Sequence, residues 1–139
     1  MERITGYDLH AQVGFLLRQA TQRHLGIFGA HLPELTPTQF AALAQLHALG
    51  PISQNALGRA TAMDAATIKG VVDRLRARGL VTTRPDPGDQ RRIYAELTGA
   101  GRALITRCTK AALQITAETL EPLTEDEREA FLALLRKLV

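Results

Sequence analysis

The sequence of 139 residues contains no tryptophan, and aromatic residues make up only 4% of it. Its core must therefore be built mainly from leucine, alanine, isoleucine and valine, a composition that favours packed helices. No stretch approaches the roughly 20 apolar residues of a membrane-spanning helix, and the first residues lack the apolar run of a secretion signal. We therefore expect a mainly helical protein of the cytoplasm.

Cysteine is almost absent as well. Cys108 is the only one, so no disulfide can form within the chain, which is consistent with a reducing compartment. The histidines (His10, His24, His31 and His47) show no tight ligand pair, so no metal site is expected. The sequence also lacks a phosphate-binding glycine loop and a nucleophile elbow. We therefore predict no cofactor and no enzymatic activity.

What the chain does have is a local excess of positive charge. The formal net charge of the chain is +3, yet the segment 69–92 alone holds seven Lys and Arg residues against three Asp residues. Guanidinium groups concentrated on a helix and a neighbouring loop are typical of proteins that neutralise phosphates. The alternative is an ordinary solvated basic surface.

The two ends of the chain are predicted to be helical. Thr5 is the expected cap of a long first helix that continues through Leu9 and ends at Pro33. Thr98 is the expected cap of a fifth helix, which Pro122 ends. The residues Thr124-x-x-Glu127 form a capping box for a sixth helix.

The centre of the chain has the spacing of a helix-turn-helix. A second helix is capped at 36–39 and stops at Gly50-Pro51, and Ser53 is the expected cap of a short helix over 54–60. Asp64 is the expected cap of a fourth, longer helix. A short helix, a brief turn and a longer helix are typical of a DNA-reading motif.

In the fourth helix one face is apolar and the opposite face is small or polar. The apolar positions recur at i, i+3, i+4 and i+7, which predicts a buried stripe of Ile68, Val71, Val72 and Leu75. Gly70 lies on the opposite face. Because a helical glycine costs about 1 kcal/mol relative to alanine, Gly70 indicates either a steric reason to lack a side chain or simple tolerance.

After Gly79, the runs 80–84 and 93–97 are rich in β-forming residues and predict a hairpin. The connection between them, Pro-Asp-Pro-Gly-Asp-Gln, is longer than a tight turn and charged at its tip. A wing is therefore expected rather than a structural connection.

These segments resemble the MarR family of bacterial winged helix-turn-helix regulators. The resemblance is carried by LTPTQFAALAQL at 35–46 and by 53–101, and most specifically by VDRLxxRGLV at 72–81 and the wing Asp-x-x-Asp-x-Arg at 86–91. It implies a mainly α fold of six helices with a small β-hairpin wing, and a homodimer intertwined through the terminal helices. It also implies one domain over 1–139, with 1–32 and 98–139 as dimerisation helices and 36–97 as the DNA-binding lobe.

The resemblance implies a sequence-specific transcriptional regulator that binds double-stranded DNA at a pseudo-palindromic operator. It places the wing arginine that enters the minor groove at Arg91 and the aspartate that orients it at Asp89, with Arg92 as an additional candidate. On the recognition helix Ala65, Thr67 and Lys69 lie near the end that enters the major groove. Backbone contacts are expected from Ser53, Asn55, Arg59, Arg74 and Arg78. Arg76 is expected to pair within the protein instead.

The stretches TPTQFAALAQL and MDAATIKGVVDRL resemble the branch of the family that responds to aromatic acids or their coenzyme A thioesters in aromatic catabolism. This implies a repressor released by a small aromatic carboxylate or aryl-coenzyme A, with no membrane partner. The candidate ligand residues are aromatic, cationic or imidazole side chains, each with a plain alternative in the core or on the surface: Tyr7, His10, Phe15, Arg18, His24, Phe28, Phe40 and His47. Two other functions stay open: a redox response through Cys108, and a winged helix that contacts another protein.

Overall fold

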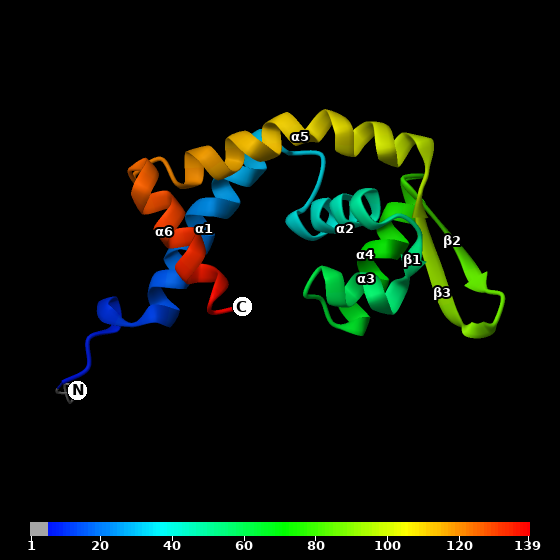
Figure 1. Cartoon of the computed structure of the whole chain (residues 1–139), viewed down its shortest axis with the longest axis horizontal. Coiled ribbons are helices and arrows are strands. Elements are labelled where there is room, and N and C mark those ends of the chain that lie inside the picture. The colour runs from blue at the N-terminus through cyan, green and yellow to red at the C-terminus, as the bar shows by residue number, and fades with distance from the viewer. Residues whose placement is uncertain (1–5) are drawn as a thin grey trace. The chain divides into compact units, whose positions relative to one another are not determined.

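The computed structural model describes residues 6–139, and the fold class is as predicted, with a small antiparallel sheet among α-helices (Figure 1). Its contacts form two compact units, one from the residues up to His31 with Ala112–Val139, the other from Leu32–Ala111. The helices are α1 (Val13–His31), α2 (Pro37–Leu49), α3 (Gln54–Ala60), α4 (Ala65–Ala77), α5 (Gly99–Thr119) and α6 (Glu125–Arg136). The strands are β1 (Ile52–Ser53), β2 (Val81–Asp86) and β3 (Asp89–Leu97).

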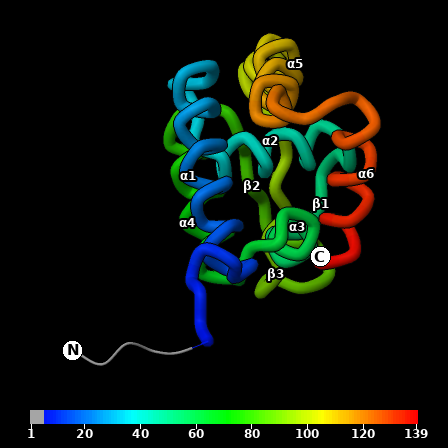
Figure 2. Tube along the Cα trace, turned by 90° about the vertical axis from the view of Figure 1, so that its left-hand side faces the viewer, coloured from blue at the N-terminus to red at the C-terminus, as the bar shows by residue number. Residues whose placement is uncertain are grey.

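The first helix begins later than predicted. Asp8 accepts a hydrogen bond from the His10 backbone N–H at 3.0 Å and caps a separate 3-10 turn over Leu9–Ala11. Gln12 is extended, so α1 starts only at Val13. Figure 2 shows α1 as a long helix near the N-terminal end of the trace. An aspartate side chain that bonds the local backbone competes with helix formation, which explains the break. The expected cap at Thr5 lies outside the described residues.

The core of the Leu32–Ala111 unit is aliphatic, as the composition predicts. The largest fully buried side chains come from α2, α3 and α4: Leu43, Leu46, Leu57, Ile68, Val71, Val72 and Leu75. The capping box at Thr36 and Gln39 is present, and Ser53 accepts a hydrogen bond from the Ala56 N–H at 3.1 Å. These caps fix where α2 and α3 begin.

The sheet corrects two expectations. It has three antiparallel strands in the order β1-β3-β2, and the two-residue β1 was not predicted. The strands of the hairpin also extend further than expected, so that Asp86 pairs with Asp89 and only Pro87 and Gly88 form the turn. Because β2 is an edge strand, Pro85 can be part of it without breaking the sheet. The register shifts between Pro85 and Asp86, so the segment 90–92, which includes Arg91, bulges out of the regular pairing near the tip of the wing.

The start of α5 packs tightly on the chain that follows α4. Thr98 accepts a hydrogen bond from the Gly101 N–H at 3.0 Å and donates one to the Gly79 carbonyl at 2.7 Å. A Cβ at Gly101 would collide with the carbonyl oxygen of Leu80. Thr98 is thus a cap, as predicted, and Gly101 permits the close approach.

The unit of α1, the end of α5 and α6 leaves much apolar surface open. Its buried side chains include Phe28, Ile115 and Leu120. Its exposed apolar side chains include Val13, Leu16, Leu17, Leu25, Leu113, Phe131, Leu134 and Leu138. An exposed apolar surface of this kind marks a site of association. None of the helices within residues 6–139 is long and apolar enough to cross a membrane.

Candidate DNA interface and ligand cavity

A tight turn sets α3 against α4. The Met63 N–H donates to the Gly58 carbonyl at 2.8 Å, and Ala62 adopts a positive φ of 56°. A Cβ at Gly58 would lie 3.1 Å from Cγ2 of Ile68, so the glycine lets the two helices approach closely. The arrangement is the helix-turn-helix that the sequence predicts.

The N-terminus of α4 is capped by a carboxylate. Asp64 accepts a hydrogen bond from the Thr67 N–H at 2.7 Å. The backbone and side-chain hydrogen bonds of Thr67 lower the pKa of Asp64 below its ordinary value of 3.8, so the cap is ionised at neutral pH. The predicted stripe of α4 is buried, and its opposite face is open to solvent at Ala66, Thr67 and Lys69.

Most cations of α4 have partners within the protein. Lys69 Nζ lies 2.9 Å from a carboxylate oxygen of Asp73, and this hydrogen bond lowers the pKa of Asp73. Arg76 donates to the Thr83 hydroxyl at 3.1 Å, which is the internal pairing expected of it. Arg78 donates to the Glu34 carbonyl at 2.9 Å.

The contact of Arg78 was not foreseen. The same guanidinium nitrogen lies 3.3 Å from Oε1 of Gln39, a buried residue that also closes the cap of α2. Arg78 therefore ties the end of α4 to the start of α2. The geometry gives it a positioning role, and whether it also meets a phosphate remains a prediction.

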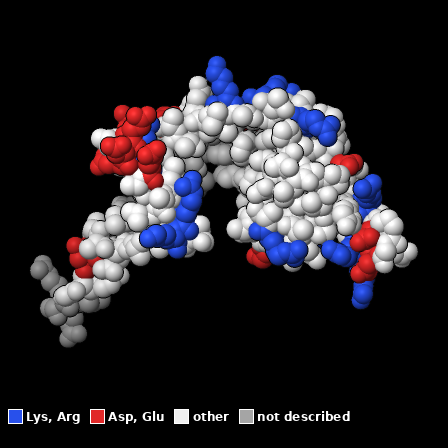
Figure 3. Space-filling view, viewed as in Figure 1, with Lys and Arg blue, Asp and Glu red and all other residues white. Residues whose placement is uncertain are grey.

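At the wing an aspartate holds an arginine. Asp89 accepts from the Arg91 backbone N–H at 3.0 Å and from its Nε at 3.3 Å, while the Arg91 side chain is 92% exposed. The carboxylate thus holds the guanidinium by its Nε edge, so that the two terminal nitrogens point away from Asp89 into solvent. Figure 3 shows positive side chains over the part of this unit that carries α3 and the wing.

Two shallow hollows bring several predicted DNA residues together. One, of about 200 Å³, is lined by Asn55, Gly58, Arg59, Met63, Ala65 and Ile68. The other, of about 50 Å³, is lined by Ser53, Gln54, Asn55, Arg91, Arg92 and Ile93. Asn55 belongs to both, so the start of α3 lies between α4 and the wing. Thr67, Lys69, Arg74 and Arg78 line neither hollow.

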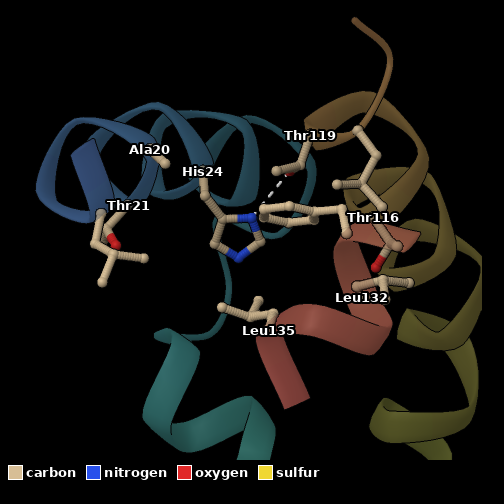
Figure 4. A pocket seen from close by; sticks show the side chains of 10 residues that line it. Ala20, Thr21, His24, Thr116, Thr119, Leu132 and Leu135 are labelled. Atoms are coloured by element: carbon tan, nitrogen blue, oxygen red, sulfur yellow. Dashed lines mark hydrogen bonds between the residues drawn. The ribbon is translucent and has the colours of Figure 1, made fainter. Parts of the chain in front are cut away.

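The other unit contains an apolar cavity of about 300 Å³ between α1, α5 and α6 (Figure 4). His24 contributes an imidazole to it, and Nδ1 of that ring lies 2.9 Å from the Thr119 hydroxyl. In Figure 4 the second ring nitrogen points away from Thr119, toward Leu135. The wall is formed by Leu17, Ala20, Thr21, His24, Thr116, Thr119, Leu120, Phe131, Leu132 and Leu135.

Of the predicted ligand residues, only His24 lines this cavity. Phe28 is buried, and its ring centroid lies 6.5 Å from that of His24. His10 packs edge-on against Phe15, with ring centroids 5.3 Å apart. The side chains of Tyr7 and Arg18 are exposed to solvent and do not line the cavity. Phe40 and His47 belong to α2 in the other unit.

The sequence analysis missed the contribution of α5 and α6 to the cavity. Thr116 and Thr119 look like ordinary helical surface positions, and no local signal separates them from their neighbours. It also missed how α1 holds the end of α5. Arg23 donates to the Thr119 and Glu118 carbonyls at 2.5 and 3.0 Å, and His31 Nε2 lies 2.5 Å from a Glu118 oxygen.

Cys108 is a buried residue of α5. Burial raises the pKa of its thiol, with a further upward contribution from the Glu34 carboxylate. A raised pKa disfavours the thiolate that oxidation requires, which argues against a redox response. Within the part of the chain that the structure describes, no group of three or more His, Cys, Asp or Glu could hold a metal ion.

Comparison with known proteins gives consistent results. A model of the MarR family matches residues 34–92. The HTH-type transcriptional repressor NicR of Pseudomonas putida is 48% identical, over 97% of this chain and 87% of its own length.

Two solved structures match both fold and length. One is BpsR of Bordetella bronchiseptica, whose DNA binding is regulated by 6-hydroxynicotinic acid. It has a TM-score of 0.91 and is 43% identical, and the match covers 95% of this chain and 96% of that chain. The PcaV transcriptional regulator of Streptomyces coelicolor, in complex with its natural ligand, has a TM-score of 0.91 and 32% identity over 97% and 96%.

Proposed function

The chain belongs to the MarR family of transcriptional regulators, and on that premise we propose that it is a homodimeric repressor released from its operator by a small aromatic carboxylate. The geometry of the wing is the observation that supports the DNA-binding part of this proposal. Asp89 holds the Arg91 guanidinium through its Nε, while the side chain is 92% exposed. A narrow minor groove concentrates negative potential and attracts an arginine presented in this way.

We assign the operator contacts to α3, α4 and the wing. The open end of α4, with Ala65, Thr67 and Lys69, faces base edges in the major groove, and Arg91 enters the minor groove with Arg92 beside it. Residues that add backbone contacts are Asn55, Arg59 and Arg74, whereas Ser53 is buried as the cap of α3. Support comes from the hollows that join α3 to α4 and α3 to the wing through Asn55.

Dimeric assembly is typical of this family. The apolar side chains exposed on α1, on α6 and just after α6, including Leu16, Leu134 and Leu138, supply the surface that a second copy would cover. We therefore assign dimerisation to the terminal helices and DNA binding to the segment 36–97. A protein that binds an operator in this way acts in the cytoplasm by binding, without catalysing a reaction.

We place the effector in the cavity beside His24. Its volume of about 300 Å³ suits one aromatic ring, and its apolar wall would cover the ring faces. The free imidazole nitrogen and the Thr116 hydroxyl can bond a carboxylate or a ring hydroxyl. A coenzyme A thioester would not fit in this volume alone and would have to extend into an adjoining hollow of about 510 Å³, which shares Leu17, Ala20, Phe131 and Leu135 with it. That BpsR responds to 6-hydroxynicotinic acid supports this class of ligand.

Release of operator DNA tests the proposal. The wild-type protein bound to a fluorescent duplex from its own upstream region is titrated with 6-hydroxynicotinic acid, with benzoate and with 2-hydroxypyridine, which lacks a carboxylate. We expect release by a carboxylate and none by 2-hydroxypyridine. In His24→Phe the same duplex should bind normally while release needs at least tenfold more acid. Binding that no carboxylate alters would contradict the effector assignment, and an unchanged response in His24→Phe would exclude this cavity.

A further inference from the structure

The face of α4 that is open to solvent contains one cation with no fixed partner. Lys69, Arg76 and Arg78 each have a hydrogen-bond partner within the protein. Among the described residues the guanidinium of Arg74 makes no hydrogen bond or salt bridge, and its side chain is exposed. Arg74 is thus the cation of α4 whose guanidinium no hydrogen bond holds in place, although its charge still contributes to the lowered pKa of Asp73.

The position of this guanidinium is defined by Gly70. The place where a Cβ of residue 70 would lie is 3.6 Å from Nη1, 3.8 Å from Nη2 and 3.9 Å from Cζ of Arg74. Residues four apart are neighbours on one face of a helix, and long side chains point toward the helix N-terminus. The Arg74 side chain thus runs back along α4 and lies over the backbone of Gly70.

Position 70 has the φ of an ordinary helix, and the three nearest atoms to its missing Cβ all belong to Arg74, at normal contact distance. Alanine would therefore fit at this position as well as glycine does. A longer side chain would enter the space that the Arg74 guanidinium occupies, so the property that matters at position 70 is that the residue is small.

We propose that Gly70 is a positioning residue for operator binding: it leaves the space in which the Arg74 guanidinium lies flat on α4 and meets a DNA phosphate. A helix with its side chains is about 10–12 Å wide and the major groove is about 12 Å wide, so little room remains for a side chain that stands away from the helix. A long side chain at position 70 would occupy the space of the guanidinium and push Arg74 outward. This inference rests on the proposed DNA-binding function.

The test is a double-mutant cycle on the full-length protein, with Gly70→Leu, Arg74→Ala and the combination. The probe is the labelled upstream duplex, measured by fluorescence anisotropy at several salt concentrations. We expect each single variant to bind about tenfold more weakly, and to lose about one unit from the slope of log K against log salt, as the loss of one phosphate contact requires. The combined variant should be no weaker than Arg74→Ala.

Gly70→Ala is the matched control. Its Cβ would lie at ordinary contact distance from the guanidinium, so operator affinity and salt slope should match the wild type while the melting temperature rises. Thermal melting of Gly70→Leu checks that the protein is folded.

The possible failures are distinct. If the wild-type protein does not bind the duplex, the proposed function fails. If the wild-type protein binds and Gly70→Leu binds equally well, this inference is wrong. It is also wrong if Gly70→Leu weakens binding further in the Arg74→Ala background, because the leucine then acts on the DNA directly.

Discussion

At the scale of single residues, function depends on which charged groups are already paired inside the protein. Seven cations lie between positions 69 and 92, but the structure separates those held by internal partners, such as Arg76 and Arg78, from those that are open, such as Arg74 and Arg91. Exposed ion pairs contribute little to stability. The pairing of Arg91 with Asp89 is therefore best explained as orientation of a side chain for binding.

Replacing Arg91 with alanine should weaken operator binding by tenfold or more and leave the melting temperature unchanged, because the side chain is 92% exposed and supports no core contact. Arg84→Ala, which removes an exposed cation from the other wing strand, is the matched control and should have a smaller effect. Anisotropy titrations of both variants make the comparison. Equal losses in the two would mean that the wing acts only through its total charge.

Leu75, in contrast to Arg91, is a core residue that should affect stability rather than binding. It is fully buried on the inner face of α4, so Leu75→Ala should lower the free energy of unfolding by about 2–5 kcal/mol. Denaturation in urea measures this value. A loss below about 1 kcal/mol would show that the inner face of α4 is loosely packed.

At the scale of helices and strands, the sequence was sufficient wherever a cap or an apolar repeat acts locally. The caps at Thr36, Ser53, Asp64 and Thr124 all form, and the stripe of α4 is buried as predicted. One error was local, because the cap at Asp8 separates a 3-10 turn from α1, and the others arose where tertiary pairing decides. The strand β1 has only two residues and exists because β3 lies beside it.

The candidate site was predictable to a similar extent. The Asp89 and Arg91 pair could be assigned because the wing motif at 86–91 resembles that of the MarR family, and the two residues are only two positions apart. The cavity beside His24 could not, because its wall combines α1 with helices about a hundred residues further along the chain. The partners of Arg78 could not be predicted either, because Glu34 and Gln39 precede it by about forty residues in the sequence.

The cap of α4 makes its stability depend on pH. Hydrogen bonds from Thr67 lower the pKa of Asp64 in the folded protein, so the carboxylate stabilises the fold above its ordinary value of 3.8, and this contribution is lost as the pH falls through the lowered pKa. Asp64→Asn keeps a capping oxygen that does not titrate. It should therefore lose less stability than the wild type between pH 7 and about 3. Urea midpoints at both pH values measure the difference, and identical losses would exclude this role.

At the scale of the whole molecule, the exposed apolar side chains of α1, α6 and the residues after α6 indicate a surface that a partner covers. Leu134 is 60% exposed and Leu138 is 68% exposed, and both line an apolar hollow that also includes Val13 and Leu16 of α1. Two copies bound to adjacent half-sites would also match the symmetry of a pseudo-palindromic operator. Dimerisation and DNA recognition are thus linked.

Leu134→Glu should therefore yield a monomer that binds the operator at least a hundredfold more weakly, since one half-site contact is lost together with the dimer. Sedimentation velocity and anisotropy measure the two effects on the same sample. Glu129→Gln, at an exposed polar position of α6, is the control and should stay dimeric. A dimeric Leu134→Glu would show that this face of α6 is not the interface.

The central claim is that α4 and the wing together read a specific duplex. The most direct measurement compares the affinity of the wild-type protein for a duplex from its own upstream region with its affinity for a scrambled duplex of equal composition, from low to physiological salt. The account predicts that the specific duplex binds on the order of a thousandfold more tightly, and that both affinities fall as salt rises. Equal affinity for the two duplexes, or no binding to either at low salt, would contradict it.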